Sequence, residues 1–580
     1  MAKHPALTLG SGRSIAAVAA LLLASVTPMR AQVVVVSPTP QVGSSNPATA
    51  APTVPRPTTK PCTVQLFQDL AFENFTPASF SYAPPADCPG PWSKVVFTAD
   101  FTVTAGTQFD RTAAFYLGHA NIYYGTTAEP RSSLSPSWHV ERDVTDLSAI
   151  FKSSQTGEAN LGNFVGVSGG TDYNGIIYAN AALEFYPSDF RNPAPPAPDI
   201  VVPVNGTGGD AGTLNTTTDQ ITQTLDLPQN VESVYLDVIA QSQIGDEFWY
   251  SCVPTAEASE LDSCGNTAFR ETEVSIDGQP AGVAPVYPWI FTGGFDPFLW
   301  EPIPDIQTLD FVPYRVNLTP FAGVLADGNT HTVAVSVYNA NGYFLATANV
   351  LVNLDHGTKK TTGGLISNTL SAAPSPSVQN NITVSSSGTA TGNILTTSNR
   401  NFAISGYIQT SHGRVVTTVQ QNVNFRNNQQ FNVNNNTPVD DQNIEQLTTV
   451  QSKTSTQQGG LVTTDEQNFR YPLNIDYSFG PTASGGFSQT TTVNQGYHKD
   501  DAQGLFGFPL YSSSVDEVEN STDTDNFDAN FNFLGNTGSN TSQSYNGRNS
   551  LGGCYSRTIT AAAQVLTSVT TGQGCNNFHF

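Results

Sequence analysis

The chain has 580 residues, of which 38% are hydrophobic, with 33 Phe and 20 Tyr, so it has enough apolar residues for folded cores and is too long for one core. Only 12% of the residues are charged, and 47 acidic against 23 basic side chains give a net charge of −24. A surface of that sign repels nucleic acid and anionic lipid, so we expect neither as a partner.

The N-terminus has the pattern of an export signal. Lys3 and Arg13 form a positive region ahead of a short apolar run over residues 15–26, and Ala31 suits a cleavage site. The run is too short for a membrane span, and no other segment predicts one. We therefore expect residues 1–31 to be a signal peptide and the protein to be secreted or periplasmic, in an oxidising compartment.

Alternating apolar and polar residues dominate the rest of the chain. Residues 32–60 are rich in Pro, Ser and Thr and predict a linker, and 193–203 form a second Pro-rich break. Between and after these breaks, segments such as 94–103 predict strands, and Asp277-Gly278 predicts a tight turn.

We therefore expect an all-β chain. It would have two tandem jelly-roll-like antiparallel β-sandwiches at 61–192 and 193–355 and a β-rich C-terminal domain at 356–580. In the last region, 415–425 predicts a long strand, whereas the Asn-rich 427–436 fits either a loop or the edge of a β-solenoid.

Six cysteines lie in three sequence-local couples, and proximity favours these couples among the fifteen pairings that are open. In an oxidising compartment each disulfide would contribute about 2–4 kcal/mol, although a free buried thiol is the alternative. The couples are Cys62 with Cys88, Cys252 with Cys264, and Cys554 with Cys575.

Neither the cysteines nor the 8 scattered histidines show the spacing of a metal site, so we expect no metal and no other cofactor. Residues 166–170 fit the G-x-S-x-G pattern of serine hydrolases. That pattern needs a strand–elbow–helix context, and here another β run follows, so we do not expect that chemistry.

Three segments carry candidate chemistry. Asp110 and Arg111 stand where a turn leads into a strand, which fits either proton transfer in a cleft or a structural ion pair. Glu247 precedes three aromatic residues, which suit sugar faces and raise the pKa of a nearby carboxyl; a core Trp beside a rim Glu is the alternative. Residues 291–300 form a Gly-Gly turn among aromatics, which fits a pocket lining or a sandwich corner.

Nine segments, taken in order, resemble the peptide-N-glycosidase A family, including its acid-active bacterial members. The likeness runs from about residue 62 to 355 and is weaker toward the end. The segments are CPGPWSKVVF (88–97), QFDRTA (108–113), TTAEP (126–130), VERDVTDL (140–147), EFWYS (247–251), FRETEVSIDG (269–278), FTGGFDPFLW (291–300), LDFVPY (309–314) and GCYSR (553–557).

The resemblance implies a peptide-N4-(N-acetyl-β-glucosaminyl)asparagine amidase, which hydrolyses the amide between the asparagine side chain and the first N-acetylglucosamine. A more distant likeness to peptide-N-glycosidase F, with two jelly rolls and the site between them, implies catalytic roles for Asp110 and Glu247. A third functional Glu of that enzyme falls near residues 165–169, where this chain has no acid. The substrate-binding candidates are Arg111, Glu129, Trp249 and Trp300.

Amide hydrolysis needs an activated water and a stabilised oxyanion. Under this interpretation Asp110 acts as the base for water or as a proton shuttle. Glu247 orients and polarises the amide across the inter-domain cleft, and Arg111 sets the charge of Asp110. We expect N-glycosylated peptides or proteins as substrates and a monomeric enzyme.

The composition also indicates acid tolerance. In strong acid the carboxylates are protonated, and self-repulsion is limited to 23 Lys and Arg and 8 His over the whole chain. We therefore expect the fold to tolerate low pH, and the resemblance to acid-active family members implies activity at acidic pH.

Three other functions fit the composition. The first is a non-catalytic glycan-binding surface protein of stacked β-sandwiches. The second is a glycosidase that cuts between sugars with the same carboxylate pair. The third is a purely structural cell-surface protein.

Overall fold

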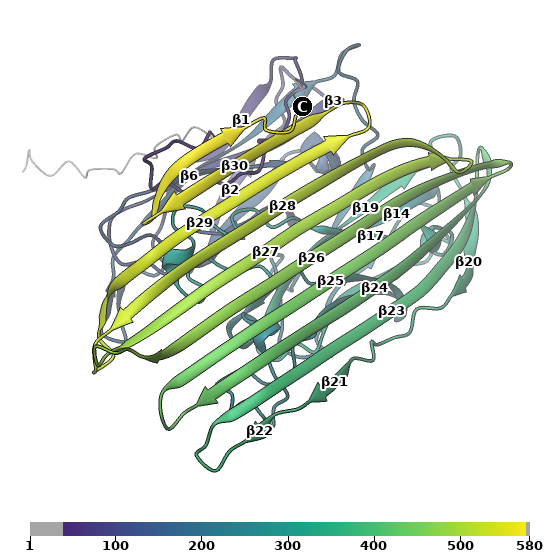
Figure 1. The fold of residues 1–580 in the computed structure, drawn as a ribbon. Coiled ribbons are helices and arrows are strands. Elements are labelled where there is room, and N and C mark those ends of the chain that lie inside the picture. Colours follow the sequence, from purple (N-terminus) through teal and green to yellow (C-terminus); the bar gives the residue numbers. More distant parts are fainter. Residues whose placement is uncertain (1–38, 576–580) are drawn as a thin grey trace, which may run out of the picture.

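The computed structural model describes residues 39–575, and strands dominate it (Figure 1). The predicted all-β class is confirmed, and the only α-helix within the described range is the four-residue α2 (Ala322–Leu325). The predicted signal peptide lies outside the described residues. Within residues 39–575 no helix combines the length and apolar character that a membrane crossing requires.

The first pair of sheets encloses an aromatic core. The rings of Phe97, Phe115 and Tyr123 are fully buried and meet in it, with ring centroids 5.3–6.0 Å apart. One sheet has the order β1 (Cys62–Phe72), β10 (Ile177–Pro187), β3 (Trp92–Val103), β6 (Ser137–Asp143), and the other β2 (Ala78–Tyr82), β7 (Gln155–Leu161), β4 (Thr112–Leu117), β5 (Ala120–Thr126). The short elements are η1 (Thr145–Leu147), η2 (Ile150–Lys152) and the ribbon of β8 (Gly166–Ser168) and β9 (Thr171–Tyr173).

The second pair of sheets follows directly in the chain. One has the order β11 (Ile200–Val204), β19 (Tyr343–Leu354), β14 (Val231–Gln243), β17 (Tyr314–Asn317), with β12 (Gly212–Leu214) also on β19. The other has the order β13 (Ile221–Leu225), β18 (His331–Tyr338), β15 (Glu271–Ile276), β16 (Gln279–Pro285). The predicted turn between β15 and β16 has φ of 50° at Asp277 and 74° at Gly278, as a tight hairpin requires.

The C-terminal region forms one 12-stranded antiparallel sheet that covers one side of the molecule (Figure 1). Its order is β20 (Thr362–Asn368), β23 (Ala390–Thr410), β24 (Gly413–Asn434), β25 (Val439–Gln458), β26 (Leu461–Pro481), β27 (Phe487–Leu505), β28 (Phe508–Phe527), β29 (Phe533–Asn549), β30 (Cys554–Ala562), β31 (Val565–Thr571). Two short strands, β21 (Ser377–Asn380) and β22 (Thr383–Val384), also pair with β23. The Asn-rich segment 427–436, which fitted a loop or a solenoid edge, continues β24 as far as Asn434.

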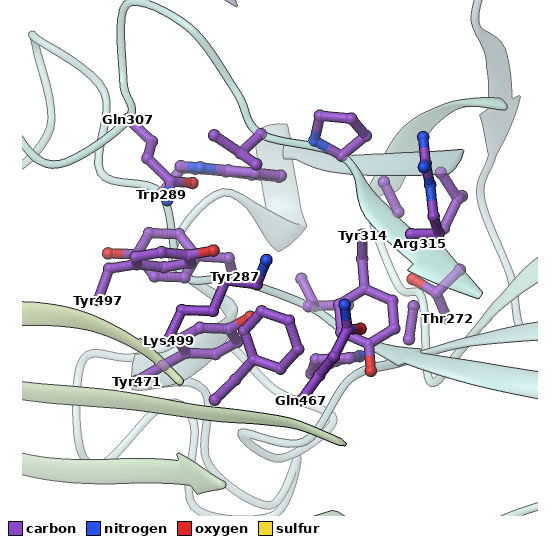
Figure 2. A pocket seen from close by; sticks show the side chains of 18 residues that line it. Thr272, Tyr287, Trp289, Gln307, Tyr314, Arg315, Gln467, Tyr471, Tyr497 and Lys499 are labelled. Atoms are coloured by element: carbon purple, nitrogen blue, oxygen red, sulfur yellow. The ribbon is translucent and has the colours of Figure 1, made fainter. Parts of the chain in front are cut away.

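The first and second pairs of sheets are called the first and second sandwich below. The inner face of the C-terminal sheet shares a core with the second sandwich. Tyr287, which follows β16, packs with its ring centroid 5.0 Å from that of Tyr471 on β26, and Tyr471 stacks on Tyr497 of β27 at 5.5 Å. Figure 2 shows these rings and Trp289 around a small cavity of about 100 Å³ at the junction. Sandwich and sheet therefore pack through large aromatic residues.

Residues 39–60 belong to the segment that the composition predicts to be a linker. They contain no strand and pack along the molecule. The amide of Gly43 donates to the carbonyl of Leu566 at 2.8 Å, and the amide of Val54 donates to Glu141 Oε2 at 2.9 Å. The segment closes a cavity of about 560 Å³ between the first sandwich and the C-terminal sheet.

The three disulfides predicted from proximity are confirmed, and the structure has no free cysteine in its described part. The division into domains at the predicted boundaries stays a prediction.

Candidate active site

Asp110 and Glu129 reach the same place because they flank one β-hairpin. Strands β4 and β5 pair with Thr112 opposite Thr126, so the residues just before β4 and just after β5 leave the sheet at the same end. The amide of Thr127 donates to the carbonyl of Arg111 at 2.9 Å and continues the pairing. The amide of Asp110 then donates to Glu129 Oε2 at 2.8 Å.

The second sandwich supplies a backbone donor. Asp110 Oδ2 accepts the amide N–H of Gly293 at 3.0 Å, and Thr292 Oγ1 donates to the carbonyl of Thr127 at 2.6 Å. A side chain at position 293 would displace the carboxylates, because a Cβ there would lie 2.2 Å from Glu129 Oε2 and 2.8 Å from Asp110 Oδ2. The Gly-Gly turn therefore lies directly against both acids.

The turn itself is held by a buried indole. Trp300 Nε1 donates to the carbonyl of Gly294 at 2.8 Å, and Asp296 caps the short helix η5 (Pro297–Leu299) by accepting the amide of Phe298 at 2.9 Å. Trp300 is 3% exposed and Trp249 is 1% exposed. Core packing therefore covers the two indole rings that we expected to bind sugar, and their role in binding stays a prediction.

Glu247 lies between the one-turn helices η3 (Ile244–Asp246) and η4 (Trp249–Ser251), which follow β14. Its neighbour Asp246 is fully buried and accepts two hydrogen bonds from Arg270, at 2.9 Å from Nε and 2.7 Å from Nη2. Asp246 Oδ2 also accepts the amide of Asn341 at 2.7 Å. This network fixes the turn that presents Glu247, and no local pattern in the sequence indicates it.

The C-terminal sheet donates hydrogen bonds to the segment that follows Glu247. Asn427 Nδ2 donates to the carbonyl of Tyr250 at 2.8 Å, and Gln429 Nε2 donates to that of Cys252 at 3.0 Å. Both amide side chains are completely buried. The Asn-rich stretch of β24 therefore serves as a set of hydrogen-bond donors to the segment that follows Glu247.

Burial shifts the protonation of all three acids. Desolvation and the charge of Asp110 raise the pKa of Glu129 to about 7 and that of Glu247 to about 7. Desolvation also raises the pKa of Asp110, but the Gly293 amide and the Arg111 charge oppose this rise. For Glu247, burial and the charge of Asp110 both raise the pKa, and both favour the protonated carboxyl.

Arg111 lies beside both acids without a direct ion pair to either. Its guanidinium packs 3.9 Å from the Phe109 ring centroid and donates from Nη1 to Gln108 Oε1 at 2.8 Å. Burial lowers its pKa to about 10, whereas Glu129 and Asp110 oppose that change. Arg111 thus contributes a positive field to the acids at short range.

The structure therefore brings together Asp110, Arg111 and Glu129 from the first sandwich, and the charge of Asp110 acts on Glu247 from the second. The part that the sequence analysis missed is the Gly293 amide, although its Gly-Gly segment was singled out as a pocket lining. Phe248, which follows Glu247, is partly buried, and its ring centroid lies 4.9 Å from that of Phe295. Ser168 of the G-x-S-x-G pattern lies in the β8–β9 ribbon, away from any strand–elbow–helix.

Comparisons with known proteins identify relatives of this chain. Residues 51–371 match the family model described as peptide N-acetyl-beta-D-glucosaminyl asparaginase amidase A. The chain is 30% identical over 413 residues to peptide-N4-(N-acetyl-beta-glucosaminyl)asparagine amidase A of Prunus dulcis, covering 67% of this chain and 70% of that protein.

Two solved structures show weaker likeness. PNGF-II is 14% identical with a TM-score of 0.37, over 51% of this chain and 66% of that one. PNGase F from Flavobacterium meningosepticum, a glycosylasparaginase, is 12% identical with a TM-score of 0.34, over 51% of this chain and 96% of that one. At these scores neither likeness bears on the site.

Proposed function

Because this chain belongs to the peptide N-acetyl-beta-D-glucosaminyl asparaginase amidase A family, we propose that it is a glycoamidase. It hydrolyses the amide between an asparagine side chain and the first N-acetylglucosamine of N-glycosylated peptides or proteins. The products are a peptide with aspartate and a glycosylamine. The observation that carries the proposal is the contact of Asp110 with Glu129 and the Gly293 amide, at the junction of the two sandwiches.

Asp110 is the base in this proposal. It takes a proton from the water that attacks the amide carbon, and the water oxygen becomes part of the new carboxylate. The Gly293 amide and Arg111 support this role because both stabilise the ionised carboxylate.

Glu247 is the acid. Its carboxyl pKa of about 7 keeps a proton available below neutral pH, which it gives to the leaving nitrogen as the C–N bond breaks. Glu129, with a pKa also near 7, holds the Asp110 backbone and together with Arg111 orients the substrate. Trp249 and Trp300 act from the core as supports of the two turns.

The proposal also covers the pH of activity, the location of the protein, its oligomeric state and its cofactors. Raised carboxyl pKa values support activity at acidic pH, because Glu129 and Glu247 stay protonated there. Three disulfides are compatible with an extracellular protein, and we propose export to the medium or the periplasm. The enzyme acts as a monomer, and the chemistry uses no metal or other cofactor.

The test is mass spectrometry of an N-glycopeptide after incubation in heavy-oxygen water at pH 5 and pH 7. Conversion of asparagine to aspartate with one heavy oxygen is the expected result. Asp110→Asn should abolish it, whereas Asp87→Asn, which removes an exposed carboxylate of the same sandwich, should not. A peptide that keeps one N-acetylglucosamine would instead identify a glycosidase, and an unchanged glycopeptide would favour a glycan-binding protein.

A further inference from the structure

Three carboxylates meet where the active-site turn rests on the C-terminal sheet. Asp296 caps η5 in the second sandwich, and Asp523 and Asp525 lie two residues apart on β28, so their side chains share one face of the sheet. One oxygen of each lies within 4.8 Å of the others. Asp296 and Asp523 are only 2% and 1% exposed.

No Lys, Arg or His in residues 39–575 forms an ion pair with any of the three. Asp523 Oδ2 and Asp525 Oδ1 are buried and receive no hydrogen bond from an N–H or hydroxyl group, and the carboxyls of Asp296 and Asp523 lie within hydrogen-bonding contact of each other. Three ionised carboxylates packed in this way repel one another strongly unless a cation or bound protons neutralise them.

A fourth candidate oxygen lies on the same face of the sheet, beside Asp523. Thr491 on β27 is the cross-strand partner of Asp523, so both side chains leave the sheet on the same face as close neighbours. Thr491 is 1% exposed, and its hydroxyl is buried without any hydrogen-bond partner. A buried hydroxyl normally has a partner, so its lack of one indicates a ligand next to Asp523.

We propose that Asp296, Asp523, Asp525 and Thr491 bind a calcium ion. All four donors are hard oxygens, which Ca²⁺ takes in irregular geometry, whereas Mg²⁺ demands a near-ideal octahedron. The carboxylates are oriented from outside: Asn536 Nδ2 donates to Asp523 Oδ1 at 2.7 Å, and the Phe298 amide donates to Asp296 Oδ1 at 2.9 Å. The net charge of −24 also attracts cations to the protein.

The ion would join the active-site turn to the sheet. Asp296 is three residues after Gly293, whose amide donates to Asp110. Ser521 on β28 already donates to the carbonyl of Leu299 at 2.7 Å from the same face. A cation between Asp296 and β28 therefore stabilises the turn without touching the reacting groups.

The test compares the melting temperature of the full chain at pH 7.5 with EDTA, with millimolar Ca²⁺ and with millimolar Mg²⁺. We expect Ca²⁺ to raise it by several degrees and Mg²⁺ to have a much smaller effect. The double variant Asp523→Asn/Asp525→Asn should lose the calcium response. Asp500→Asn, which removes an exposed carboxylate from β27, should keep it.

A second measurement needs no variant. Hydrogen exchange of the wild-type protein should show slower exchange in residues 291–300 when Ca²⁺ is added, and isothermal titration should give one saturable site. An unchanged melting temperature, an equal response to Mg²⁺, or a calcium response that persists in the double variant would overturn the proposal. The first of these results would mean that protons, not a metal ion, neutralise the cluster.

Discussion

The contact between Gly293 and the two acids predicts the effect of one added methyl group. In Gly293→Ala the new Cβ would lie 2.2 Å from Glu129 Oε2 and 2.8 Å from Asp110 Oδ2, well inside van der Waals contact. The turn or the carboxylates must therefore move apart, and we expect this movement to break the 3.0 Å hydrogen bond from the Gly293 amide to Asp110.

The size of the effect follows from that bond. A hydrogen bond to a charged group contributes about 1.5–3 kcal/mol, and each ~1.4 kcal/mol of lost transition-state stabilisation is a factor of about ten in rate. We therefore expect kcat/KM to fall by roughly 10- to 150-fold. The Gly293 amide lowers the pKa of Asp110, so its loss should also move the acidic limb of the pH–rate profile to higher pH.

The assay is deglycosylation of a glycopeptide over a pH series, with the melting temperature measured in parallel. Gly364→Ala is the matched control, because a Cβ there meets only Tyr407 Cε1, at 4.0 Å. A folded Gly293→Ala protein with unchanged kcat/KM and an unshifted acidic limb would refute the assignment of Asp110 and Gly293 to one site.

Three further predictions follow from buried charges. Glu247→Gln should lower kcat by roughly 10²–10⁴-fold and remove the basic limb near pH 7, while Glu260→Gln, an exposed acid of the same loop, leaves the rate unchanged. Arg270→Met should leave the fully buried Asp246 unpaired and cost about 3–5 kcal/mol, measured by denaturant unfolding; a change under about 1 kcal/mol would contradict the network described. Burial raises the pKa of Glu517 from 4.5 to about 8. Below pH 4.5 the carboxyl is protonated in both the folded and the unfolded state and does not affect stability, whereas between pH 4.5 and about 8 the free energy of unfolding falls as pH rises. Glu517→Gln should therefore flatten the fall in melting temperature between about pH 5 and pH 9, and an equal fall in both proteins would count against it.

The contacts of the C-terminal sheet indicate that it supports the two turns of the active site. Its side chains donate to the carbonyls of Tyr250, Cys252 and Leu299, which belong to the two turns that carry Glu247 and Gly293. The polar composition of its strands, which by itself suggested a structural surface protein, suits this use. Buried Asn, Gln and Ser side chains satisfy the backbone groups that irregular turns leave without partners.

The sequence by itself determined the local features of this protein. Strand periodicity predicted the all-β class because alternation along a strand is a property of consecutive residues. Proximity predicted the three disulfides because each closes a short loop. Asp110 was marked by its place before a strand, and its nearness to Glu129 follows from one hairpin register.

Only the tertiary structure decided what meets across the sheets. Gly293 is 183 residues from Asp110, and Asp523 is far from Asp296, so no periodic pattern relates them. The same holds for the burial of Trp249 and Trp300, which the local sequence does not reveal: both indoles lie in the core, and Trp249 packs against Phe425 of the C-terminal sheet. Such contacts depend on how whole layers stack, which is set by the summed burial of many side chains and not by the residues next to each one.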